Sequence, residues 1–450
     1  MEVSDGLAVP QRYWAMLTVT LAVAMAVLDG AIANIALPTI AVDVQATPAE
    51  SIWVVNAYQL MIIICLLPLA SLGENFGYRK VYNIGLAVFT VGSFGCALSG
   101  SLPILIAARV LQGFGAAGIM SVNGALLRYI YPRSHLGRGI GINALVVAAS
   151  SALGPTVASG ILSLTSWPWL FAVNVPIGIV AFAIALRSLP INPRTQHPFD
   201  GASAVLNALT FGLLVFSVDG LGRSDDLWIQ AGEFAVALLA AWGLVRRQLS
   251  LASPLLPVDL LRIPVFRLSI CTSICSFAAQ ALAFVSMPFY FHGSLGRDAV
   301  ATGLLMTPWP LATAIVAPIT GRLSDRYPSG LLGGLGLVLL AFGLAMLAGL
   351  PEQPATFDVI WRMTVCGAGF GLFQAPNNRT MLSSAPRERS GGASGMVSTA
   401  RLLGQTTGVA IASVLFGVFP GRSTTLAVAA AAGMAATAAG FSLLRLQHQK

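Results

Sequence analysis

The sequence contains few charged residues for its length. Only 9% of its 450 residues are Asp, Glu, Lys or Arg, whereas soluble domains carry about 25%. The 25 Lys and Arg outnumber the 17 acidic residues, but they lie mainly in short segments between apolar stretches, where anionic headgroups and membrane insertion account for them. The composition therefore excludes an ordinary soluble domain, and we expect no nucleic-acid partner.

Cysteine and histidine are also scarce. The five cysteines all lie within apolar stretches, and the four histidines are scattered along the chain. No nucleophile has a recognisable His and acid partner, and no His, Cys and carboxylate residues have the spacing of metal ligands. We therefore expect no enzyme activity, no catalytic residues, no metal site and no cofactor.

Long apolar runs are what the sequence has in abundance. Residues 13–37 contain a single charge, Asp29, and about 20 apolar residues suffice for a helix to cross a bilayer. The same test along the chain predicts an all-α membrane protein with fourteen transmembrane helices. These are expected at residues 13–37, 51–72, 81–101, 103–126, 139–163, 168–188, 202–221, 228–245, 267–291, 300–320, 330–350, 358–380, 392–419 and 424–444.

The distribution of basic residues predicts the orientation. With a cytoplasmic N-terminus, only Arg223, Arg297 and Arg422 fall in segments outside the cell, and most other Lys and Arg fall inside. The first apolar run is too long for a cleaved signal, so it is expected to stay as a helix. Both termini are therefore predicted to be cytoplasmic.

An internal repeat divides the chain. The segment ASLGENFGYRK (70–80) matches GRLSDRYPSG (321–330), and a shift of 251 residues places Glu74 on Asp325. Two pseudo-symmetric six-helix bundles are predicted, at 1–190 and 267–446, separated by two extra central helices within 198–248 and a cytoplasmic linker at 249–266. Parallel six-helix repeats are typical of transporters, which bind substrate between the repeats near the bilayer midplane.

Six motifs, in order and in the expected helices, resemble the major facilitator superfamily and, within it, the fourteen-helix drug:proton antiporters. They read LDGAIANIALP, ASLGENFGYRK, RVLQGFGAAG, ALGPTVASG, WPWLFAVNVPIG and RLLGQTTG. The resemblance covers nearly the whole chain and implies the MFS fold, alternating access, and residence in the bacterial inner membrane. Two departures are Glu74, where the family usually has Asp, and Ala158 with Ser159, where it has paired glycines.

Asp29 is the leading candidate for proton coupling. At about 1.5 Å per residue it lies about 24 Å along the first span, inside the hydrocarbon. An unpaired carboxylate there favours its protonated form, and a lipophilic cation nearby would favour the ionised form, so that proton and cargo would be linked. Two other interpretations stay open: Asp29 forms a structural pair with Arg109 or Arg401, or it caps a weak point at Gly30. The repeat places Gln280 at the equivalent position.

Two arginines within spans are further candidates. Arg109 stays charged and must find a carboxylate, carbonyls or water, and the resemblance implies a role in proton transfer. Arg401 is a second intramembrane charge of the same kind, for which a structural role is equally acceptable. Arg362 lies near the outer end of its helix and is expected to reach the interface.

Two loops and one helix are candidates for gating. The first loop contributes Glu74, Gly77, Arg79 and Lys80, and its repeat contributes Arg322, Asp325 and Arg326. An acid there can face the positive N-terminal end of a helix in the opposite half and hold the cytoplasmic side closed. Gly154 and Pro155 permit bending or close helix packing, and the resemblance links them to antiport.

Polar, aromatic and sulfur-containing side chains within the spans are candidates for the cavity wall. They are Trp53, Asn56, Tyr58, Gln59, Gln112, Asn143, Gln280, Phe284, Met306, Trp309, Gln374 and Asn377. Aromatic and Met side chains with one acid suit flexible recognition of hydrophobic cations.

The sequence therefore predicts a monomeric, proton-coupled exporter of amphipathic, cationic small molecules in a lipid bilayer. Two alternatives remain: an exporter of a specific metabolite or natural product, and a membrane sensor or scaffold that transports nothing.

Overall fold

The computed structural model describes residues 6–132, 135–191, 199–220, 227–251, 258–324, 326–351, 353–385, 390–419 and 421–448. Within these residues all regular structure is helical. The centre of the predicted linker, residues 252–257, and the turn between the two extra helices, residues 221–226, lie outside the described ranges.

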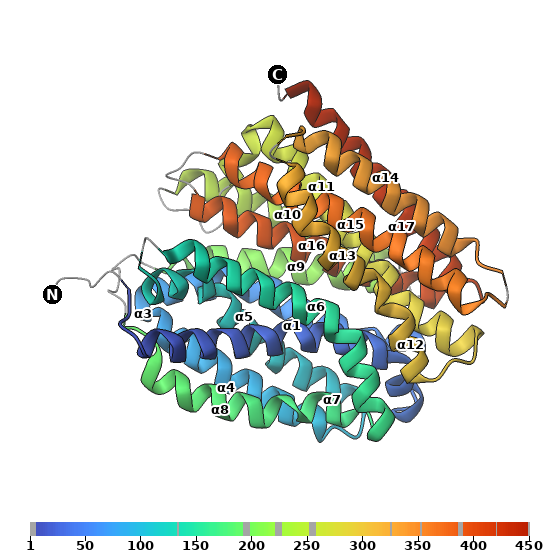
Figure 1. Cartoon of the computed structure of the whole chain (residues 1–450), viewed down its shortest axis with the longest axis horizontal. Helices are drawn as coiled ribbons and strands as arrows, with labels where there is room; N and C mark the ends of the chain where they lie inside the picture. Colours follow the sequence, from blue (N-terminus) through green and yellow to red (C-terminus); the bar gives the residue numbers. More distant parts are fainter. Residues whose placement is uncertain are drawn as a thin grey trace.

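The N-terminal half is a bundle drawn in blue to green in Figure 1. Its helices are α1 (Gln11–Asp43), α2 (Pro48–Ser51), α3 (Trp53–Phe76), α4 (Tyr78–Ala97), α5 (Leu102–Ile130), α6 (Leu136–Leu164), α7 (Pro168–Ala172) and α8 (Asn174–Ser188). Local sequence sets several boundaries. Thr47 and Glu50 form a capping box before α2, and Gly77, with φ of +101°, separates α3 from α4 in a conformation that favours glycine.

The C-terminal half is drawn in yellow to red in Figure 1. It comprises η2 (Val258–Arg262), α11 (Pro264–Phe289), the π-helical turn η3 (Tyr290–Ser294), α12 (Ala299–Met306), α13 (Pro308–Leu323), α14 (Ser329–Ala348), α15 (Thr356–Ser384), α16 (Ser390–Val418), α17 (Ser423–Leu444) and η5 (Arg445–His448). Between the halves, α9 (Gly201–Gly220) and α10 (Leu227–Ser250) pack on each other, and α9 contacts both α3 and α16.

The internal repeat is visible in equivalent close contacts. A Cβ atom at Gly113 would lie 2.6 Å from the carbonyl oxygen of Tyr58, and one at Gly367 would lie 2.1 Å from that of Trp309. Because glycine lets helix backbones approach this closely, α3–α5 and α13–α15 pack in the same way. When the two halves are aligned on Gly113 and Gly367, the residue equivalent to Arg109 is Met363 and not Arg362.

Eleven helices of the described chain are long and apolar enough to cross a membrane. The remaining predicted spans correspond to α4, α9 and α15, which are long helices of the same assembly but fall outside those eleven. The structure therefore supports a multi-pass, all-helical membrane protein, and the count of fourteen spans remains a prediction.

The two halves share a core at one end only. There, where α6 and α12 meet (right in Figure 1), Ile35 and Leu37 of α1 belong to the same hydrophobic cluster as Met306 and Trp309 of the C-terminal half. At the other end one cluster belongs mainly to the N-terminal half and another, around Phe266, to the C-terminal half. Under the predicted topology, the halves are closed on the outer side and have separate cores on the cytoplasmic side.

Candidate functional site

Asp29 is buried at a junction of three helices in the N-terminal half. Its side chain, on α1, accepts hydrogen bonds from Arg109 Nη1 on α5, from Gln112 Nε2 (2.7 Å) and from Asn174 Nδ2 on α8 (3.0 Å). The residue is 2% exposed. The expectation of an unpaired carboxylate is therefore wrong for this conformation, and of the two candidate partners the structure selects Arg109.

Arg109 is fully buried and is held by more than the carboxylate. Its Nε donates to the carbonyl oxygen of Val54 on α3 (2.8 Å), and its Nη1 also donates to Gln112 Oε1 (2.6 Å). The guanidinium carbon lies 4.1 Å from the centre of the Tyr58 ring, within cation-π range. Only Nη2 lacks a hydrogen-bond partner among the described residues.

A second layer of hydrogen bonds fixes the groups around this ion pair. Gln112 Nε2 also donates to Ser93 Oγ on α4 (2.8 Å), and the Tyr58 hydroxyl donates to the carbonyl oxygen of Ala26 (2.9 Å). Removing one charge from a buried pair costs about 3–5 kcal/mol, because the other charge is left without compensation. Protonation of Asp29 would have the same effect on Arg109, so the arrangement can convert arrival of a proton into repacking of α1, α5 and α8.

Gly154 and Pro155 connect this junction to the opposite half. A Cβ at Gly154 would lie 2.5 Å from the Cβ of Ala31, two residues beyond Asp29 on α1. On the adjoining part of α6, a Cβ at Gly303 of α12 would lie 2.6 Å from the carbonyl oxygen of Pro155. Helix α6 is therefore packed closely against both α1 and α12 at the closed end.

The structure describes all of the first gating loop (70–80) but only part of its repeat (321–330). Glu74 and Lys80 are exposed, Gly77 adopts the left-handed conformation, and Arg79 donates to the carbonyl oxygen of Leu186 on α8. Arg326 is exposed. Asp325 and the side chain of Arg322 lie outside the described residues, so the role of these loops in gating remains a prediction.

The predicted cavity residues do not form one group. Those that are half-buried are Gln59, Asn143, Gln280, Phe284 and Gln374, and those that are buried are Trp53, Asn56, Tyr58, Gln112, Met306, Trp309 and Asn377. Tyr58 and Gln112 belong to the ion-pair site. Trp53 stacks on Phe216 of α9, with ring centres 5.1 Å apart, so an extra helix covers it. Most of the buried residues therefore serve packing or polar networks in this conformation, whereas the buried amide of Asn56 has no hydrogen-bond partner among the described residues.

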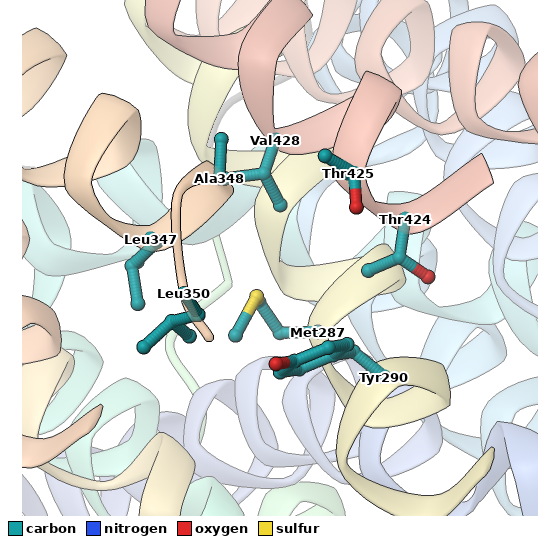
Figure 2. A pocket seen from close by; sticks show the side chains of 8 residues that line it. All are labelled: Met287, Tyr290, Leu347, Ala348, Leu350, Thr424, Thr425 and Val428. Atoms are coloured by element: carbon teal, nitrogen blue, oxygen red, sulfur yellow. The ribbon is translucent and has the colours of Figure 1, made fainter. Parts of the chain in front are cut away.

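A pocket lies elsewhere, at the end of the C-terminal half where α14 ends and α17 begins. Figure 2 shows its lining side chains, which come from α11, η3, the end of α14 with its following turn, and α17. They are Met287, Tyr290, Leu347, Ala348, Leu350, Thr424, Thr425 and Val428. Its lining contains none of the predicted cavity residues and no charged side chain, so it is not the site anticipated from the sequence.

Arg401 and Arg362 differ sharply in their surroundings. Arg362 Nη2 pairs with Asp358 (3.0 Å) and Nη1 donates to the carbonyl oxygen of Met346 (2.5 Å), near the N-terminal end of α15; that this end faces the outside remains a prediction. Arg401 is half-buried on α16, with no ion pair, hydrogen bond or aromatic contact to any described residue. The proposed alternative pairing of Arg401 with Asp29 is not formed.

One polar cluster was missed in the sequence. Arg445, just beyond the last predicted span, is fully buried and donates to Asn377 Oδ1 (2.6 Å), Ser269 Oγ (3.0 Å) and Ser442 Oγ (2.5 Å). Asn377, expected in the cavity wall, also donates to Ser273 Oγ (2.8 Å) within this cluster. Arg445 was not among the candidates because it follows the last predicted span, and no sequence pattern indicated that α11, α15 and α17 enclose it.

Comparisons with known proteins agree with this architecture. The sequence pattern of the Major Facilitator Superfamily matches residues 19–409. The chain is 58% identical to the uncharacterized transporter YebQ of Escherichia coli (strain K12), over 99% of this chain and 98% of that protein. It is 29% identical to the riboflavin transporter RibZ of Clostridioides difficile (90% and 88% covered) and 30% identical to the multidrug efflux pump LfrA of Mycolicibacterium smegmatis (91% and 82%).

Solved structures show the same fold. A bacterial homolog of the human lysosomal transporter Spinster, in an inward-facing and occupied conformation, superposes with a TM-score of 0.72 at 15% identity, and the likeness covers 98% of each chain.

Proposed function

Because the chain belongs to the major facilitator superfamily, we propose that this membrane transporter is a proton-coupled exporter that moves amphipathic small molecules by alternating access. The observation that carries the proposal is the buried Asp29–Arg109 pair, which joins α1 to α5 at a site that a proton would disrupt. Intramembrane ionisable residues are functional by default, because they are costly to place in a bilayer.

The coupling follows from the contacts of the pair. When Asp29 binds a proton, Arg109 loses its only carboxylate among the described residues and must move toward other acceptors or water. Movement of α1 is passed to α6 through Gly154, which has no room for a side chain against Ala31, and from α6 to α12 through Pro155 and Gly303. Protonation thereby favours separation of the halves at the end where they are now closed.

The cargo is an amphipathic small molecule. Export of several compounds is supported by the likeness to a multidrug efflux pump, and transport of one metabolite by the likeness to a riboflavin transporter. A cationic cargo loses the support it had from the sequence, because the Asp29 carboxylate that was to attract it is engaged by Arg109. A role as a sensor or scaffold has no observation in its favour.

The remaining parts of the proposal concern location and gating. We place the protein in the bacterial inner membrane as a monomer with both termini on the cytoplasmic side, from the distribution of basic residues. Glu74 and its repeat position, Asp325, control closure of that side. Replacing Glu74 by Gln should slow turnover and spare dye binding, and equal loss of both would argue against a gate.

The test uses proteoliposomes that hold a pH-sensitive dye. Rhodamine 123 and fluorescein are added in turn, and proton movement in response to each is recorded for the wild type and for Asp29→Asn. The variant should insert normally but lose pH-driven transport of any dye that the wild type carries. The control is Asp358→Asn, which removes an acid from the outer-end pair with Arg362 and should keep transport. Undiminished transport by Asp29→Asn would refute the proposal.

A further inference from the structure

Arg401 lies where the two halves meet. Its neighbours in sequence point to different cores: Leu402 packs in the cluster of the N-terminal half, and Ala400 packs in the cytoplasmic-end cluster of the C-terminal half. Two turns further along α16, Val409 belongs to the core shared by both halves. The Arg401 side chain therefore lies on the helix that borders all three clusters, next to the zone where the shared core gives way to separate cores.

The partial exposure of Arg401 is not exposure to lipid. Between Ala393 and Gly417, none of the described side chains of α16 is exposed. Helices α3, α9, α11, α15 and α17 surround it. The space that the Arg401 guanidinium reaches is therefore inside the protein.

A charged group at this depth needs an anion or water. Arginine remains protonated in proteins, and residue 401 lies eleven residues, about 16 Å, into α16. Among the acidic side chains described within the spans, Asp29 is paired with Arg109, Asp358 with Arg362, and Glu233 is half-buried on α10; the side chain of Asp219 lies outside the described residues. Within the described part of the chain, the positive charge of Arg401 therefore has no acidic partner.

We propose that Arg401 binds the cargo, and that the cargo class is an amphipathic organic anion bearing a carboxylate or phosphate group. A guanidinium presents paired N–H donors that match such groups, and charge-assisted hydrogen bonds are about twice as strong as neutral ones. The apolar part of the cargo would lie against the half-buried Ile274 and neighbouring residues of α11, which are level with this part of α16 because a Cβ at Gly404 would lie 2.5 Å from the carbonyl oxygen of Ile274. This inference rests on the proposed transport function and names the substrate class for it.

The test measures binding without any gradient, so that its result is independent of coupling. Fluorescence anisotropy of fluorescein, an anion, and of rhodamine 123, a cation with a similar ring system, is titrated with the full-length protein in a neutral detergent. We expect fluorescein to bind at least tenfold more tightly than rhodamine 123. Arg401→Gln should weaken fluorescein binding about tenfold, which corresponds to about 1.4 kcal/mol, and should leave rhodamine 123 unchanged.

Controls separate charge from structure. Arg401→Lys should restore much of the fluorescein affinity, because it returns the charge, and Arg246→Gln, which removes an exposed arginine of α10, should change nothing. Equal binding of the two dyes, or unchanged fluorescein binding by Arg401→Gln, would overturn the proposal. Displacement of fluorescein by added phosphatidylglycerol would also overturn it, since the site would then hold a lipid headgroup. Selective fluorescein binding without proton-driven transport would uphold the anion site and refute the proposed coupling.

Discussion

In the N-terminal half, the side chains between α1, α4 and α5 are charged or polar, whereas three of the four equivalent positions of the C-terminal half are apolar and the fourth is the neutral Gln280. A shift of 251 residues makes Gln280 the equivalent of Asp29 and Leu344 the equivalent of Ser93. When the repeats are aligned on Gly113 and Gly367, Met363 is the equivalent of Arg109 and Cys366 is the equivalent of Gln112. Leu344, Met363 and Cys366 have no exposed surface and lie in the shared hydrophobic core. The same backbone packing therefore accommodates either an ion pair or ordinary apolar packing.

Under the proposed proton coupling, the difference predicts which half responds to protons. A buried ion pair costs desolvation energy, and replacing one by apolar residues is often neutral or stabilising. Its presence in one half only is therefore poorly explained by stability. The C-terminal half instead buries Arg445 among neutral oxygens, near the C-terminal end of α17. No described carboxylate pairs with Arg445, so a proton has no charge to neutralise there. We infer that the N-terminal half titrates and the C-terminal half follows.

The largest effect is expected from breaking the ion pair on one side. Arg109→Met leaves the Asp29 carboxylate buried without its cation, which should cost about 3–5 kcal/mol of stability and abolish transport. Asp29→Gln combined with Arg109→Met copies the composition of the C-terminal half and should regain most of the stability without transport. Thermal unfolding of the purified proteins measures their stability, and dye transport measures their activity. A double variant that is no more stable than Arg109→Met would contradict the comparison.

The next effect concerns the contact between the halves. A Cβ at Gly303 would lie 1.7 Å from Ser159 Oγ and 2.6 Å from the Pro155 carbonyl oxygen, so Gly303→Ala should prevent α12 from closing on α6. Overpacking of this kind costs about 1–3 kcal/mol, and it disfavours the closed conformation. Dye transport should fall about tenfold. Gly321→Ala is the control, because a Cβ there meets nothing within 4 Å, and an equal loss in both variants would exclude a specific contact.

A smaller effect is expected at the buried arginine of the C-terminal half. Arg445→Gln removes hydrogen bonds to Ser269 and Asn377 and should destabilise the protein by about 1–3 kcal/mol. If this cluster only holds α11, α15 and α17 together, the pH dependence of transport should keep its wild-type midpoint. Transport rates recorded across a pH series test this expectation. A shifted midpoint would show that the C-terminal half takes part in proton coupling.

The smallest effect is expected at the outer-end pair. Arg362→Gln breaks an ion pair with Asp358 whose two side chains retain 12% and 28% of their surface. Exposed pairs contribute about 0–1 kcal/mol, so unfolding temperature and transport should both stay near the wild-type values. A loss as large as that of Arg109→Met would mean that position along the helix, rather than burial, decides the importance of an arginine.

Several features of the site were within reach of the sequence. The apolar runs, the repeat and the motifs identified a membrane transporter with two related halves, and a lone carboxylate in the first span singled out Asp29. The pairing of Asp29 was left open, because Arg109 and Arg401 both lie within spans and sequence distance does not rank them. The assignment of Asn377 to a cavity wall failed for the same reason, since its partner Arg445 is 68 residues away.

Hydrophobicity, charge distribution and repetition act locally along the chain, so the sequence by itself determined that the protein crosses a membrane many times, that it consists of two related halves, and that Asp29 lies within an apolar run long enough to span a bilayer. Which charges meet depends on how helices from distant parts of the chain rotate and pack. Only the tertiary structure decided that Asp29 is compensated by Arg109, that Arg445 is enclosed by neutral side chains, and that Arg401 has no acidic partner among the described residues.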